Sequence, residues 1–270
     1  MAKKAVAKKK AVELSLVSND ILLQDDGSGL ESVDSQDLMI PRIALLQSGS
    51  PQVEKRNSQY IEGAEVGHIF NTVTRSITDG EKGITVVPIK YRRAYIEWKP
   101  RSVGGGFVKD YGNDATILDS CEQDKETFRH ITSDGNEIVT TGEYFIFLIG
   151  KNGAYEPAVL SMTGSQLKKS RRWNSMMNQL RLEKPDKTGY FTPAMFYSAF
   201  HLTTVPEEND KGTWFGWDIE MLFGDKGGII NNLAGGEEIY MAARAFKERA
   251  AQGDVQVHDG GDASEEEVPF

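Results

Sequence analysis

The chain has 270 residues, of which 39% are hydrophobic and 9% aromatic, so it can bury the core of one sizeable domain or of two small ones. Its formal net charge of −9 argues against a protein that binds nucleic acid over its whole surface. No apolar run approaches the roughly 20 residues of a membrane helix, and the basic N-terminus lacks the apolar stretch of a secretory signal. We therefore expect a cytoplasmic protein that has no contact with a membrane.

The charge is distributed unevenly along the chain. Residues 1–12 contain five lysines and no acid, whereas residues 254–270 contain six acids and neither Lys nor Arg. Without these charged ends the middle of the chain still carries −8, so any DNA path must be a local basic groove. Lysines, and then acids, serines and glycines, cluster before position 37, which is typical of a flexible segment. We expect a flexible basic segment (1–36), a folded DNA-binding domain (37–253) and a disordered acidic tail (254–270).

Strands predominate among the elements expected over residues 66–162. Ile84–Ile89 is rich in β-branched residues and continues as a strand through Tyr91–Trp98. Two hairpins follow, one turning at Ser133–Asn136 and the other at Lys151–Gly153, where an Asn-Gly pair is a strong turn signal. Short strands separated by regular turns predict a β-barrel or sandwich. The hairpin strands are expected at 127–131 and 137–141, and at 143–149 and 156–162.

A helix is expected after these strands. Thr163 and Gln166 have the spacing of a capping box, in which each side chain caps a backbone N–H of the other. The helix would run on until Pro185 stops it, with Trp173 and Leu180 on its inward face.

The last third of the chain is expected to hold two more strands and a closing helix. Strand signals return over 194–204 and 213–221, joined by a polar loop at 206–212. A helix over 237–250 has acids at its start, cations at its end and an apolar stripe along one face. The stripe comprises Ile239, Ala242, Ala243 and Phe246. The predicted fold class is therefore mainly β, of the α+β type.

Residues 90–111 have the composition that binding of single-stranded DNA requires, namely aromatic rings that stack on bases and cations that neutralise phosphates. A strand there would put Tyr91, Arg93 and Tyr95 on one face and Arg92 and Trp98 on the other. A hairpin with core aromatics and solvated arginines is the alternative. The candidate DNA contacts of this segment are Lys90, Tyr91, Arg92, Arg93, Tyr95, Trp98, Lys99, Arg101, Phe107 and Lys109.

The expected helix after Thr163 carries a second basic cluster. Lys168, Arg171 and Arg172 can share a face, while Trp173 packs inward. A helix face that is merely solvated is the alternative. The candidate DNA contacts of this helix are Lys168, Lys169, Arg171 and Arg172.

Enzyme signatures are absent from the sequence. Residues 79–85 lack the Lys-Ser/Thr pair of a phosphate-binding loop, and neither a nucleophile elbow nor a zinc-protease motif occurs. Cys121 is the only cysteine, and the four histidines are far apart. We therefore expect no disulfide, no metal and no cofactor, and a binding protein rather than an enzyme.

The chain ends in three acids followed by a small hydrophobe, Pro and Phe. This ending is similar to the C-terminal tip of bacterial single-stranded DNA-binding proteins, which has the same order of residue types. A partner can bind the terminal ring in an apolar pocket, the carboxylate with a cation, and the acids with a basic rim. The candidate partner-binding residues are Glu265, Glu266, Glu267, Val268, Pro269 and Phe270.

Together with the two basic segments, this tail makes the chain resemble the phage-encoded single-stranded DNA-binding proteins. The resemblance implies an OB-fold-like β-barrel elaborated with a few helices, and sequence-independent binding of single-stranded DNA in replication, recombination and repair. It also implies that the tail recruits a polymerase, helicase-primase or nuclease in the host cytoplasm, and it leaves a homo-oligomer open. The alternatives are a single-strand annealing recombination protein, a virion structural or assembly protein with no DNA affinity, and a metal-dependent nuclease.

Overall fold

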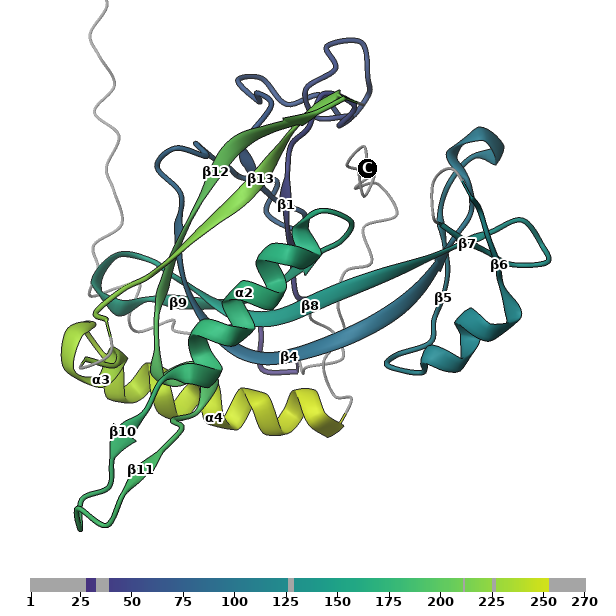
Figure 1. The fold of residues 1–270 in the computed structure, drawn as a ribbon. Coiled ribbons are helices and arrows are strands. Elements are labelled where there is room, and N and C mark those ends of the chain that lie inside the picture. Colours follow the sequence, from purple (N-terminus) through teal and green to yellow (C-terminus); the bar gives the residue numbers. More distant parts are fainter. Residues whose placement is uncertain (1–27, 33–38, 126–128, 211, 225–226, 253–270) are drawn as a thin grey trace, which may run out of the picture.

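The computed structural model describes residues 28–32, 39–125, 129–210, 212–224 and 227–252 (Figure 1). The six tail residues expected to bind partners, and the basic run at the N-terminus, lie outside these described residues.

Eleven strands form one strongly curled sheet, and two more strands form a separate hairpin. The order in the sheet is β13-β12-β4-β8-β9-β1-β2-β3, with β5 beside β4, β7 beside β8, and β6 beside β7. All neighbours run antiparallel except β1 and β9. The strands are β1 (Arg42–Leu45), β2 (Ile69–Asn71), β3 (Ile77–Thr78), β4 (Ile84–Trp98), β5 (Phe107–Asp110), β6 (Glu122–Gln123), β7 (His130–Ile131), β8 (Glu137–Ile149), β9 (Tyr155–Met162), β12 (Phe200–Asn209) and β13 (Gly212–Met221), with β10 (Leu182–Glu183) and β11 (Tyr190–Phe191) in the separate hairpin.

A few helices accompany the strands, so the prediction of a mainly β fold with helical additions is confirmed. The α-helices are α2 (Gln166–Gln179), α3 (Ile229–Asn232) and α4 (Gly236–Gln252). The short 3-10 helices are η1 (Arg101–Val103), η2 (Ala115–Ser120), η3 (Lys151–Gly153) and η4 (Met195–Tyr197).

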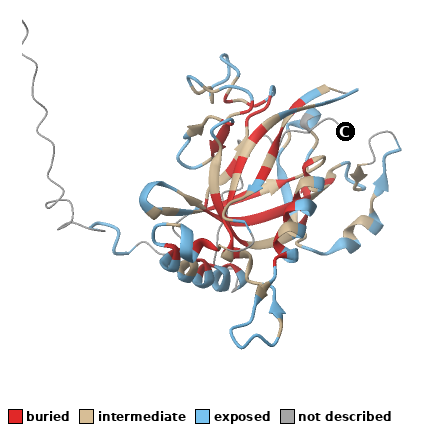
Figure 2. Ribbon diagram, turned by 60° about the vertical axis from the view of Figure 1, so that its left-hand side comes forward, coloured by how far each residue is buried: buried red, intermediate tan, exposed pale blue. Residues whose placement is uncertain are grey.

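The sheet has a helix on each face, α2 on one and α4 on the other (Figure 1). Because side chains alternate along a strand, Tyr144 and Ile146 of β8 pack toward α2, and Phe145 and Phe147 pack toward α4. The cluster around α2 takes residues from seven strands, so α2 lies on the concave face of the curl. Figure 2 shows buried residues concentrated along the strands between these helices.

β4 and β8 are the two longest strands, with 15 and 13 residues, and they pair over most of their length. The strand expected from Ile84 through Trp98 is confirmed, and it has a bulge between Pro88 and Lys90. The strands expected at 137–141 and 143–149 are one strand, which pairs with both β7 and β9. The far ends of β4 and β8 carry β5, β6 and β7 on the right of Figure 1, and we call this part of the molecule the arm.

Loops of the β2 and β3 region approach β12, which lies toward the other end of the sheet. The Thr204 hydroxyl donates to the Gly67 carbonyl at 2.7 Å, and the Thr204 N–H donates to the Gly80 carbonyl at 3.0 Å. A Cβ atom at Gly80 would lie 2.0 Å from the Thr204 hydroxyl oxygen, so only glycine permits this approach. These hydrogen bonds help to hold the curl.

The capping-box prediction is wrong. Ser165 is the N-cap residue of α2, and no side chain caps the helix there. The side chain of Gln166 instead accepts a hydrogen bond from the Trp217 N–H at 3.0 Å, because β13 lies close to this end of the helix.

The strand limits expected for 194–212 also differ from the structure. β12 begins at Phe200 because η4 buries Phe196 beside α4. The segment expected to be a polar loop is mostly strand, since β12 extends to Asn209 and β13 begins at Gly212. The closing helix is confirmed, and Ile239, Ala243 and Phe246 of its stripe are buried.

Candidate nucleic-acid interface

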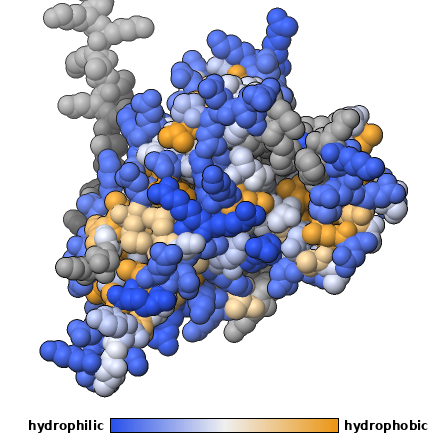
Figure 3. Space-filling model, in the orientation of Figure 1, coloured by the Kyte–Doolittle hydropathy of each residue, from blue (hydrophilic) through white to orange (hydrophobic). Residues whose placement is uncertain are grey.

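The outward face of α2 is basic. Its buried residues include Ser170, Trp173 and Met177, which recur at helical spacing and face the concave side of the sheet. Three cations are consequently exposed, and no acid occurs between Thr163 and Leu182. Figure 3 shows hydrophilic side chains gathered over α2 in the middle of this face. The exposed cations are Lys168, Arg171 and Arg172.

Lys169, the fourth cation expected to contact DNA, already has a partner within the chain. Its ammonium group forms a salt bridge with Glu207 of β12, and both side chains are partly buried. The contact fixes the start of α2 against the β12–β13 hairpin.

Gly142 of β8 lies next to both basic segments. It pairs with Arg93 across β4 and β8. A Cβ atom at Gly142 would lie 2.8 Å from the Ser170 Oγ of α2 and 3.3 Å from a ring carbon of Tyr91. Arg93 and the middle of α2, which are far apart in sequence, therefore both lie beside Gly142 on the concave side of the sheet.

Arg93 lies between two tyrosines on this face, as strand alternation predicts. Hydrogen bonding to Tyr91 and Tyr95 raises the pKa of the Arg93 guanidinium, so the side chain keeps its charge. Tyr91 packs on Tyr144 with 5.0 Å between ring centroids, and Tyr95 is buried. The two tyrosines support the arginine, and the arginine is the exposed group.

Arg92 points to the opposite face and takes part in an ion network there. Its Nε donates to Glu143 at 2.5 Å and its Nη2 to Asp110 at 2.7 Å. Glu143 is fully buried and also accepts from Arg42 at 2.9 Å. Arg92 thus neutralises a buried carboxylate, which ties β1, β8 and β4 together.

Lys90 is also directed away from the concave face. Its ammonium donates to the Ala250 carbonyl near the end of α4 at 2.7 Å and lies 5.8 Å from the centre of the Phe145 ring. Burial lowers the pKa of Lys90, and the nearby charges of Arg92 and Lys247 lower it further.

The other candidates of the first segment lie in the arm. Trp98 packs edge-on against Phe107, with 5.8 Å between ring centroids, and Phe107 remains 40% exposed. Lys109 lies over the Tyr111 ring at 4.4 Å. Lys99 is exposed, and Arg101 belongs to η1. The arm therefore offers one accessible ring with exposed cations beside it.

The structure thus divides the predicted contacts into three groups. Arg93 and the exposed cations of α2 share the concave face, whereas Lys99, Phe107 and Lys109 lie in the arm. Lys90 and Arg92 make their contacts on the opposite face of the sheet.

The sequence analysis missed Tyr190 and Phe191, two exposed aromatic residues of the β10–β11 hairpin. The signal was present in the sequence, since both follow the basic stretch that includes Lys184 and Lys187.

Among the described residues, no group of three or more His, Cys, Asp and Glu is arranged to hold a metal ion. Within the described ranges, no helix is both long and apolar enough to cross a membrane.

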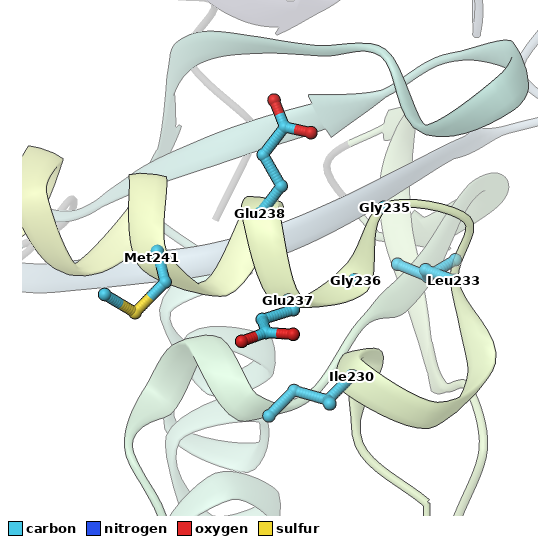
Figure 4. A pocket seen from close by; sticks show the side chains of 7 residues that line it. All are labelled: Ile230, Leu233, Gly235, Gly236, Glu237, Glu238 and Met241. Carbon is cyan, nitrogen blue, oxygen red and sulfur yellow. The ribbon is translucent and has the colours of Figure 1, made fainter.

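A pocket of about 590 Å³ lies at the start of α4. Figure 4 shows Glu238 pointing away from Ile230 at this site. Its lining contains two acids and no cation, so it does not suit a phosphate. The lining residues are Ile230, Leu233, Gly235, Gly236, Glu237, Glu238 and Met241.

Comparison with known proteins gives one finding. The model of the Pam3 phage gp34-like protein family matches residues 9–256, which is most of the chain. Neither a curated protein nor a solved structure matches it.

Proposed function

The chain belongs to the Pam3 phage gp34-like protein family, and on that premise we propose that it binds single-stranded DNA without sequence preference during phage DNA replication, recombination and repair. The observation that carries the proposal is that Arg93 and α2 both lie beside Gly142 on the concave side of a curled β-sheet, with the basic face of α2 turned outward.

Electrostatics favours this face over others. Residues 166–191 contain seven cations and two acids, a net charge of +5, and the remainder of the chain sums to −14. A phosphate backbone would be attracted to α2 and repelled by most other surfaces. Contacts of cations with phosphates carry no sequence information, which suits binding that does not depend on sequence.

Stacking would come from the arm. Phe107 presents an accessible ring beside Lys99 and Lys109, which is the combination that binders of single-stranded DNA use. The strongly curled β-sheet supports the further proposal that the fold is an elaborated OB-fold. Binding involves no chemistry, and the coated strand is kept free of hairpins.

The tail completes the proposal. Glu265–Glu267 and the terminal Val268-Pro269-Phe270 would recruit a polymerase, helicase-primase or nuclease in the host cytoplasm. Deleting Phe270 is expected to abolish capture of such partners from infected cells while DNA affinity stays equal or rises. Unchanged capture by the shortened chain would refute the role of the tail.

DNA affinity is tested by fluorescence anisotropy with labelled oligo-dT and with a duplex of equal length, over a range of salt concentrations. We expect binding to the single strand, weaker binding to the duplex, and affinity that falls as salt rises.

Two triple variants with the same change in charge locate the site. K168A/R171A/R172A removes the exposed cations of α2, and R244A/K247A/R249A removes three from the exposed face of α4. The α2 variant should lose affinity, and its slope of log K against log salt should fall by about 2, since each single-strand phosphate contact contributes about 0.7. The α4 variant should behave as wild type. No binding by wild type at low salt, or equal losses in both variants, would overturn the proposal and favour a role in virion assembly.

A further inference from the structure

The β10–β11 hairpin projects from the end of α2, away from the body of the molecule (Figures 1 and 2). Its strands pair with each other and not with the large sheet, with Leu182 opposite Phe191 and Glu183 opposite Tyr190. Two-stranded hairpins have marginal stability in water by themselves. This one nevertheless exposes 69% of Tyr190 and 41% of Phe191. Its exposed rings contribute little to the core and need another explanation.

The hairpin tip is well defined. The Asp186 carboxylate accepts hydrogen bonds from the Thr188 N–H at 3.0 Å and from the Thr188 hydroxyl at 2.7 Å. Lys187 has the left-handed φ of 56°, and the Lys184 N–H donates to the Gly189 carbonyl at 2.8 Å. An ordered tip holds the exposed Lys184 and Lys187 beside the aromatic strand.

The hairpin also continues the basic surface of α2. Arg181 lies at the junction, where its guanidinium donates to the Leu180 carbonyl at 3.0 Å at the C-terminal end of the helix. α2 is about 21 Å long, and the chain continues from it through β10 to a turn in which the Lys187 N–H donates to the Lys184 carbonyl at 2.9 Å. Cations therefore follow one another from the helix to the hairpin tip.

We propose that the β10–β11 hairpin is a second contact for single-stranded DNA, in which Tyr190 stacks on a base and Lys184 and Lys187 contact the phosphates beside it. The inference rests on the proposed function and extends its binding path from α2 to the hairpin tip. The occupant is a nucleic acid because two exposed rings here lie beside cations, in a basic part of an acidic chain. A purely apolar partner would leave these cations without a role.

The test uses the full chain and a length series of labelled oligo-dT. Tyr190→Ala should weaken binding of the long oligonucleotides roughly tenfold, the effect of losing one stacked base, and should leave binding of the shortest ones unchanged. Tyr190→Phe keeps the ring and should retain wild-type affinity. Lys187→Asn suits the left-handed backbone and should reduce the salt slope by about 0.7. Met241→Ala, which alters an exposed residue of α4, is the surface control.

The results separate the two proposals. If wild type binds oligo-dT and Tyr190→Ala binds every length equally well, the hairpin inference is overturned and the proposed function stands. If wild type binds no single strand at all, both are overturned. If Tyr190→Ala changes only the sedimentation coefficient, by losing self-association, the hairpin joins copies of the chain and the inference is overturned. A tenfold loss that Tyr190→Phe also shows would equally exclude stacking by the ring.

Discussion

The side-chain amide of Gln47 hydrogen-bonds to both backbone groups of Phe215. Its Nε2 donates to the Phe215 carbonyl at 2.8 Å, and its Oε1 accepts from the Phe215 N–H at 2.7 Å. Gln47 follows β1, whereas Phe215 is in β13 at the end of the sheet order. One buried side chain thus supplies the pair of hydrogen bonds that a neighbouring strand would otherwise make, and it joins two parts of the curl.

Replacing Gln47 by Ala should lower the free energy of unfolding by about 1 to 2 kcal/mol. Both groups of Phe215 lose their partner, and water replaces it only in part at this half-buried position. Urea unfolding followed by circular dichroism measures the loss, with Gln179→Ala at the exposed end of α2 as the control. Equal midpoints for the two variants would show that the amide does not stabilise the curl.

Replacing Glu143 by Gln should lower the free energy of unfolding by about 3 kcal/mol. The carboxylate is fully buried between Arg42 and Arg92, and its loss leaves two guanidinium groups with less compensating charge. The exposed Glu220→Gln is the matched control in the same unfolding assay. A variant as stable as wild type would mean that the desolvation of this carboxylate cancels its attraction to the arginines.

Gly142→Ala should displace α2 from β8, because the new methyl group would lie 2.8 Å from the Ser170 Oγ. Overpacking of this kind costs about 1 to 3 kcal/mol. Adding Ser170→Ala removes the closest atom, so the double variant should be more stable than the sum of the two single losses predicts. Strict additivity of the two substitutions would argue against direct contact between these positions.

Alkaline pH should destabilise the protein through Tyr144. Burial raises the pKa of Tyr144, whose hydroxyl lies 2.8 Å from the Ser170 Oγ and 3.1 Å from the Asn174 Oδ1. In the unfolded chain a tyrosine loses its proton near pH 10. The contribution of protonated Tyr144 to the free energy of unfolding is therefore complete below about pH 10. Above that pH it declines by about 1.4 kcal/mol per pH unit.

Unfolding midpoints at pH 9, 10 and 11 check this expectation. Tyr144→Phe should be less stable than wild type at pH 9, because it lacks the hydrogen bonds, but its midpoint should fall less steeply with pH. Tyr190→Phe, at an exposed position, should keep the wild-type slope. Parallel curves for wild type and Tyr144→Phe would exclude Tyr144 as the group responsible.

Sequence patterns predicted those elements that are determined by residues close together in the chain. The stripe of Ile239, Ala243 and Phe246 predicted the closing helix, since a helix on a sheet needs one apolar face. The Asn-Gly pair predicted the β8–β9 turn, where Asn152 and Gly153 both have positive φ. Alternation likewise placed Arg92 and Arg93 on opposite faces of β4.

Features that depend on distant partners could not be predicted in this way. Gln166 does not cap its helix because Trp217, 51 residues further on, binds its side chain. Arg92 belongs to the ion network rather than to an exposed face because Glu143 is buried opposite it. The contact of Ser170 with Gly142 needs the complete sheet. The candidate DNA residues were therefore found by composition, but the accessible ones among them could be identified only from the fold.

The burial of each tryptophan determines which of them can report on binding through intrinsic fluorescence. Trp173, Trp214 and Trp217 lie in the core, whereas Trp98 is partly exposed in the arm beside Phe107. Any change in intrinsic fluorescence on titration would then report on the arm alone, against a constant background from the core. Trp98→Phe would remove this partly exposed reporter. The difference between the emission spectra of wild type and the variant would then give the signal of Trp98.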